Sequence, residues 1–193
     1  MSTFPLTGSQ TVGPFFGPGL LREDARRNVL TQPETVGERI RIEGRVLDGD
    51  GIPVPDAMVE IWQANAHGRY NHPADQGPVS LDPTFLGFGR AGTGEDGSYW
   101  FETIKPGYVL FSKEQQQAPH ICITVFARGL LNHVVTRLYF EDEPANTLDP
   151  ILQYVPEERR ATLMARRESE GAPVVYRFDI ILQGAGETAF FNV

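Results

Sequence analysis

The alternation of polar and apolar positions is clearest in residues 39–47, where the two kinds follow each other with a period of two. Side chains of a strand point alternately to its two faces, so this period predicts a half-buried strand. Residues 118–128 instead form a near-continuous run of β-branched and apolar residues, which is typical of a strand buried on both faces. We expect this second stretch to be a central strand, with His120 at its beginning and Arg128 at its end.

Shorter patterns of the same kind predict a mainly β chain. The further strands expected are residues 56–64, 98–104, 134–140, 174–182 and 188–191. Asp-Gly steps at 48–51 and 95–97 predict turns, and residues 157–168, which follow a proline, predict one helix. Many short strands with turn signals and a single helix predict a β-sandwich.

The first part of the chain differs from the rest in composition. Residues 3–20 hold three prolines and several glycines, which argues against a regular helix there. Phe15 and Phe16 would be unfavourable in water, so we expect this arm to pack on its own domain, on a partner or around a site. The expected division is residues 1–38 as N-terminal arm and loop, and residues 39–193 as sandwich.

Charge and cysteine content narrow the function. The chain of 193 residues carries a formal charge of −8 with a pI near 5.0, which argues against nucleic acid or an anionic membrane as partner. Its one cysteine, Cys122, fits a reducing compartment. Neither a signal peptide nor a membrane-spanning run is visible, so the expected location is the cytoplasm.

A few side chains near the predicted strand ends could carry chemistry. Tyr70, Tyr108 and His120 are oxygen and nitrogen donors of the kind that suits ferric iron. A complete set would need a second histidine two residues after His120, where this chain has Cys122, a soft ligand. Arg128 could recognise a carboxylate through a bidentate pair, or form an interface salt bridge.

Several runs, in this order and spacing, resemble the intradiol ring-cleavage dioxygenases. They are residues 59–64, 68–70, 97–99, 103–107, 118–121, 137–142 and 176–180. The arm at 9–14, the strand end at 126–129 and the tail at 186–191 are most similar to the α chains of two-chain members of that family. The similarity extends from about residue 9 to the C-terminus.

The resemblance implies a transthyretin-like β-sandwich that forms α/β pairs and assembles into a large hetero-oligomer. It implies a non-haem Fe(III) ion, held by two tyrosines and two histidines of the partner β chain. It also implies an oxidoreductase, an intradiol dioxygenase that uses O₂ to open protocatechuate to 3-carboxy-cis,cis-muconate. That reaction belongs to the β-ketoadipate pathway of aromatic catabolism.

The residues at the family's metal positions are only partly retained. Tyr70 and His120 fall on ligand positions, Cys122 replaces the second histidine, and Gln117 stands where the catalytic chain has an arginine. Tyr108 follows a shortened loop, so its correspondence to the second tyrosine is doubtful. The resemblance therefore implies neither a metal nor catalytic residues on this chain alone.

The resemblance gives this chain a place at the substrate pocket instead. It implies that Thr11, Gly13, Pro14 and Arg128 lie at the mouth of the partner's iron site. Two alternatives stay open, namely a self-sufficient catechol-type dioxygenase and a purely structural transthyretin-like assembly subunit.

Overall fold

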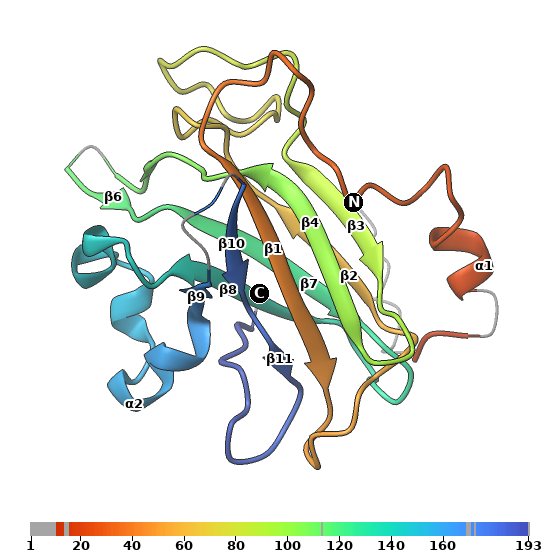
Figure 1. Ribbon diagram of the computed structural model, residues 1–193. Helices are drawn as coiled ribbons and strands as arrows, with labels where there is room; N and C mark the ends of the chain where they lie inside the picture. Colours follow the sequence, from red (N-terminus) through yellow and green to blue (C-terminus); the bar gives the residue numbers. More distant parts are fainter. Residues whose placement is uncertain (1–10, 14–15, 113, 169–170, 172, 193) are drawn as a thin grey trace, which may run out of the picture.

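The computed structural model describes residues 11–13, 16–112, 114–168, 171 and 173–192 (Figure 1). Its strands are β1 Arg39–Leu47, β2 Met58–Trp62, β3 Phe88–Gly92, β4 Ser98–Ile104, β5 Val109–Leu110, β6 Gln116–Gln117, β7 His120–Phe126, β8 Val134–Phe140, β9 Met164–Arg167, β10 Val174–Arg177 and β11 Ile180–Ile181. Its helical elements are α1 Phe16–Leu20, η1 Pro144–Leu148, η2 Leu152–Tyr154, α2 Glu157–Arg160 and η3 Ala161–Leu163. Among the described residues, no helix has the length and apolar character needed to cross a membrane.

The strands form two layers around one core, as expected for a sandwich (Figure 1). One layer contains β4, β1 and β10, with β11 extending it, and the other contains β3, β2, β7 and β8. Strand β9 pairs with β8 and with β10, and so joins the layers along one edge. The alternate residues of β1 and β7 that point inward, such as Ile42 and Ile123, are at most 1 % exposed.

Strands β1, β4 and β8 begin and end at the residues expected from the pattern. The expected strand 174–182 is instead split into β10 and β11. At the break, the Phe178 N–H donates to the Glu43 carbonyl and the Asp179 carboxylate accepts from the Arg45 N–H. Both β10 and β11 therefore pair in parallel with β1, on either side of this break. The expected strand 188–191 is reduced to a single bridge between Phe191 and Val135.

The expected helix at 157–168 is wrong beyond residue 163. Helix α2 ends at Arg160, the 3-10 turn η3 continues to Leu163, and Met164–Arg167 form strand β9. Met164 and Ala165 pair in parallel with Tyr139 and Phe140 of β8, and Ala165 is fully buried. The pairing and burial available in the sheet outweigh the helical propensity of this segment, because propensity is a weak preference.

Two shorter elements also differ from the expectation. No regular helix was expected in the arm, but residues Phe16–Leu20 form the short helix α1. Pro18 is tolerated because it lies in the first turn, where the backbone N–H groups have no partner within the helix. Strand β3 was not expected, because its sequence FGRAG contains two glycines, which have a low strand propensity. Gly89 is required there, since a Cβ would approach the Ile61 and Leu30 side chains to 2.9 Å.

The loop before Tyr70 is held by a close backbone contact at Gly68. Gly68 has a φ of 83°, and a Cβ on it would lie 1.8 Å from the Tyr108 carbonyl oxygen. Gly51 has a similar φ of 76° but nothing within 4 Å of the equivalent position. We expect Gly51→Ala to lower the free energy of unfolding by about 1–2 kcal/mol and Gly68→Ala by at least about 3 kcal/mol. Urea unfolding of the two variants measures this; equal losses would mean that the Gly68 contact is unimportant.

Candidate functional site

The candidate residues form two groups at the two ends of strand β7. Its Ile121, Ile123 and Val125 side chains fill the core, whereas Cys122 and Thr124 on the other face are half-buried. A strand buried on both faces was expected. Beyond Ile121 this is wrong, because the outer face of β7 is only half-buried. The two candidate groups lie at opposite ends of the strand, around His120 and around Arg128.

The first group, called the β7 cluster below, consists of Tyr70, Gln117, His120, Cys122 and Arg137. The His120 Nδ1 atom lies 2.7 Å from the Ala118 carbonyl oxygen, so this nitrogen carries the proton. The Tyr70 hydroxyl lies 3.3 Å from Nε2 and therefore donates to it. The Tyr70 ring also stacks on Trp62, with 5.7 Å between the ring centroids. The proton of the Tyr70 hydroxyl therefore occupies the lone pair of the His120 Nε2 atom.

Arg137 brings a positive charge into the same cluster. It lies on β8 directly opposite Cys122 of β7. Its Nη1 atom donates to the Gln117 side-chain oxygen at 2.7 Å and to the Tyr139 hydroxyl at 3.4 Å. Sequence reasoning did not single out Arg137, because its position within a regular strand gives no signal of a half-buried charge beside His120.

Burial keeps the titratable members of the cluster neutral. It lowers the pKa of His120 to about 4, with the nearby Arg137 charge acting in the same direction. It raises the pKa of Tyr70 far above its usual value, and Cys122 adds to this effect. It also raises the pKa of Cys122, which Arg137 partly opposes. At neutral pH the cluster is a phenol, an imidazole and a thiol beside one cation.

A buried carboxylate, also missed from the sequence, supports the cluster. Asp149 is 0 % exposed and accepts four hydrogen bonds. The donors are the backbone N–H groups of Ala118, Ile151 and Leu152 at 2.8, 2.9 and 2.7 Å, and the Tyr139 hydroxyl at 3.1 Å. Asp149 therefore ties the beginning of β7 to β8 and to the turn at η2. An Asp two and three residues before such N–H groups is the one signal in the sequence that could have found it.

The cluster does not fit a ferric ion. A ferric site needs a phenolate oxygen and an imidazole nitrogen with a free lone pair. Here burial keeps Tyr70 protonated, and its hydroxyl donates to the lone pair of the His120 Nε2 atom. Cys122 contributes a soft sulfur, and Arg137 already supplies a positive charge. Tyr108 is not part of the cluster: it is half exposed, and its hydroxyl donates to Glu143 at 3.0 Å.

The low pKa of His120 has a consequence for stability. The imidazole has a pKa of about 4 in the folded chain against an ordinary 6.5, so between these values the unfolded chain binds more protons. Stability is therefore lost as the pH falls from 6.5 to 4, by up to about 3 kcal/mol. We expect the melting temperature of His120→Gln to depend less on pH between 7 and 4.5 than that of the wild type. His72→Gln, at an exposed histidine, is the control and should keep the wild-type dependence.

The second group lies where the arm crosses the far end of β7. The Gly129 N–H donates to the Thr11 hydroxyl at 3.2 Å, and the Phe16 ring packs on Phe126 at a centroid distance of 6.0 Å. A cavity of about 280 Å³ opens between the arm and the strand end. Its lining residues are Val12, Gly13, Phe16, Gly17, Pro18, Leu21, Asp56 and Arg128.

Arg128 is the most exposed charged group of this cavity. Its side chain is 72 % exposed and its Nε atom pairs with the Asp56 carboxylate. Of the residues expected at a substrate mouth, Gly13 and Arg128 line this cavity, and Thr11 is bonded to Gly129 beside it. Pro14 lies outside the described residues. Asp56 was missed from the sequence because nothing local links it to a residue 72 positions away.

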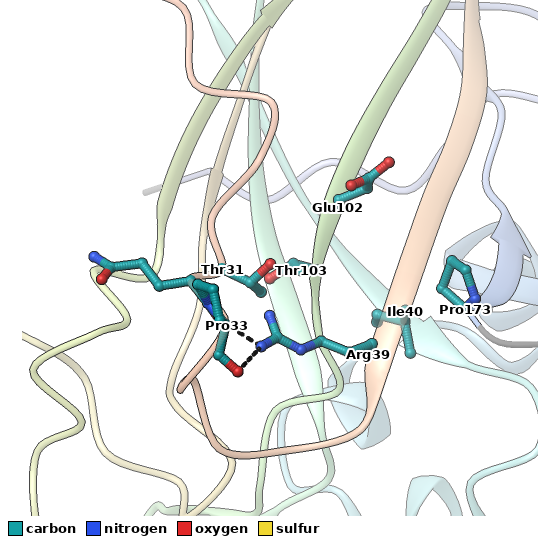
Figure 2. Close-up of a pocket in the computed structure, with 8 residues that line it drawn as sticks. Thr31, Pro33, Arg39, Ile40, Glu102, Thr103 and Pro173 are labelled. Carbon is teal, nitrogen blue, oxygen red and sulfur yellow. Dashed lines mark hydrogen bonds between the residues drawn. The ribbon is translucent and has the colours of Figure 1, made fainter.

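A larger pocket, of about 460 Å³, lies between residues 31–33, β1 and β4, away from both groups (Figure 2). Figure 2 shows the Arg39 guanidinium pointing across it toward the 31–33 segment. That guanidinium donates to the backbone carbonyls of Gln32, Pro33 and Thr35. Its charge thus serves the folding of the loop, and the pocket offers no arrangement of reactive side chains.

Comparisons with known proteins identify the family of this chain. The family model described as "Dioxygenase" matches residues 11–184. The protocatechuate 3,4-dioxygenase alpha chain of Burkholderia cepacia is 45 % identical, with 100 % of both chains covered. The beta chain from the same organism is 40 % identical over 95 % of this chain and 78 % of its own length.

A solved structure supports the fold. The dioxygenase domain of a dioxygenase carbohydrate-binding protein fusion from Streptomyces sp. SirexAA-E superposes with a TM-score of 0.64 at 28 % identity, covering 83 % of this chain and 89 % of that one. Sequence and fold lead to the same assignment. This chain belongs to the family of intradiol ring-cleaving dioxygenases.

Proposed function

We propose that this chain is the α subunit of a protocatechuate 3,4-dioxygenase. In this proposal a partner β chain holds the ferric ion, and the α/β pair uses O₂ to open protocatechuate to 3-carboxy-cis,cis-muconate. The observation that carries the proposal is the full-length similarity to an alpha chain of that enzyme. The β7 cluster supports it, because its donors do not suit ferric iron and a self-sufficient enzyme would need such a site.

The contribution of this chain to the substrate pocket is the arm cavity. Protocatechuate carries a carboxylate, and Arg128 is an exposed guanidinium at the cavity wall. An arginine can bind a carboxylate through two parallel hydrogen bonds. Asp56 holds the guanidinium in place until the substrate carboxylate competes for it. Thr11 fixes the arm against the end of β7 through Gly129, and Gly13 lines the same cavity.

Purification of the chain with and without its β partner tests the proposal. The pair is expected to hold one iron per α/β unit, to show phenolate-to-iron absorbance and to consume O₂ with protocatechuate. The chain alone is expected to be colourless and inactive. Iron and activity in the chain alone would favour a self-sufficient enzyme, and a pair without activity would leave an assembly subunit.

We place the chain in the cytoplasm, because its single cysteine supports a reducing compartment.

We also propose that residues 1–38 form an arm and residues 39–193 a sandwich, because the composition changes between these two parts. The burial of Leu30 in the sandwich core indicates that the two parts are closely packed.

A further inference from the structure

The β7 cluster contains a side-chain cation beside the residues that fall on metal-ligand positions. Arg137 lies on β8, an inner strand of the sheet between β7 and β9, so its backbone is fixed on both sides. Gln117 and Tyr139 fix it through neutral oxygens. Within the described part of the chain, no carboxylate lies within salt-bridge distance of it, so its charge acts on Cys122, Tyr139 and Tyr70.

We propose that the Arg137 guanidinium takes the place of a metal ion in this chain, supplying a fixed positive charge to the β7 cluster and keeping metal cations out. The proposal rests on the proposed function, because the ligand positions are those carried over from the dioxygenases. It assigns a role to a residue that the substrate pocket does not use. It also explains why Tyr70 and His120 can be retained without forming a metal site.

Two physical effects exclude a metal ion. A second cation placed among Tyr70, His120 and Cys122 would be repelled by Arg137. The repulsion is stronger than in bulk water, because His120 is buried and the other three side chains are half-buried. The Tyr70 hydroxyl and the His120 Nε2 atom would also have to give up their mutual hydrogen bond. The first effect depends on the charge at position 137 and the second does not, so they can be separated.

Charge substitutions at Arg137 in the α/β assembly test the proposal, with Zn²⁺ as the probe. Zinc suits the imidazole and thiol already present in the cluster. Titration calorimetry with ZnCl₂ is expected to show one new site per α/β pair in Arg137→Gln, at least tenfold tighter than any binding to the wild type. Arg137→Lys keeps the charge and is expected to show no such site. Adding Cys122→Ser to Arg137→Gln is expected to abolish it.

A matched control removes a charge elsewhere. Arg166 is exposed on β9, and Arg166→Gln should bind zinc as the wild type does. Equal zinc binding by Arg137→Gln and Arg137→Lys would overturn the proposal, as would a folded Arg137→Gln assembly with no new site. Gel filtration and protocatechuate-dependent O₂ uptake show that the assembly is intact.

A second variant covers the case in which Arg137→Gln disrupts assembly. Cys122→His completes the missing histidine while leaving Arg137 in place, and iron content is the readout. If Arg137 excludes metals, this variant is expected to stay at one iron per pair. Two irons per pair would overturn the proposal. Failure of the proposed function is distinguishable, since it would appear as a wild-type pair without protocatechuate activity.

Discussion

Replacing Asp149 with alanine is expected to lower the free energy of unfolding by about 3–5 kcal/mol, because three backbone N–H groups, two of them buried, and the Tyr139 hydroxyl lose their acceptor. Each unsatisfied buried donor has a cost of roughly 1–3 kcal/mol, and part of it is recovered by relaxation or water. For a chain of this size the melting temperature should fall by roughly 6–20 °C. Calorimetry of the purified α/β assembly measures this shift.

The control for Asp149 is an exposed aspartate that accepts a similar bond. Asp96 lies in the turn before β4 and accepts from the Ser98 N–H at 3.1 Å. Asp96→Ala should lower the melting temperature by only a few degrees, since water can replace the lost acceptor. A loss for Asp149→Ala no larger than that of Asp96→Ala would contradict the role assigned to the buried carboxylate.

Replacing Arg128 with alanine is expected to weaken protocatechuate binding by about 10- to 100-fold, the size of a lost charge-assisted hydrogen bond. The expected change is in the KM and the dissociation constant, with a smaller change in kcat, because the metal would stay on the partner. Arg128→Lys should fall between the two, since lysine keeps the charge without the bidentate geometry. Steady-state kinetics and equilibrium binding with the purified pair measure both.

Two comparisons separate substrate recognition from an interface role. Catechol lacks the carboxylate, so its binding should be nearly equal in wild type and Arg128→Ala. Asp56→Asn removes the competing partner of the guanidinium and should leave protocatechuate binding unchanged or stronger. Equal losses for protocatechuate and catechol, or none for either, would instead support a structural role for Arg128.

Regular alternation made much of the fold predictable. Strands β1, β4 and β8 are predictable from local patterns. One face of each strand packs on the core, so apolar residues recur along it. Strands β3 and β9 are not predictable in this way. Gly89 in β3 has room for no Cβ, and Ala165 in β9 pairs with Phe140 of β8. These strands depend on contacts with residues distant in the sequence, which local propensity does not describe.

The candidate site divides in the same way. The amino-acid sequence by itself determined the mainly β class, the loss of the second histidine at Cys122 and the family, because these depend on residue types and their order. Only the tertiary structure decided that Arg137 faces Cys122, that Asp149 anchors the beginning of β7 and that Asp56 pairs with Arg128. Such contacts join residues far apart in the chain, and the strength of a buried charge depends on neighbours that only the folded chain brings together.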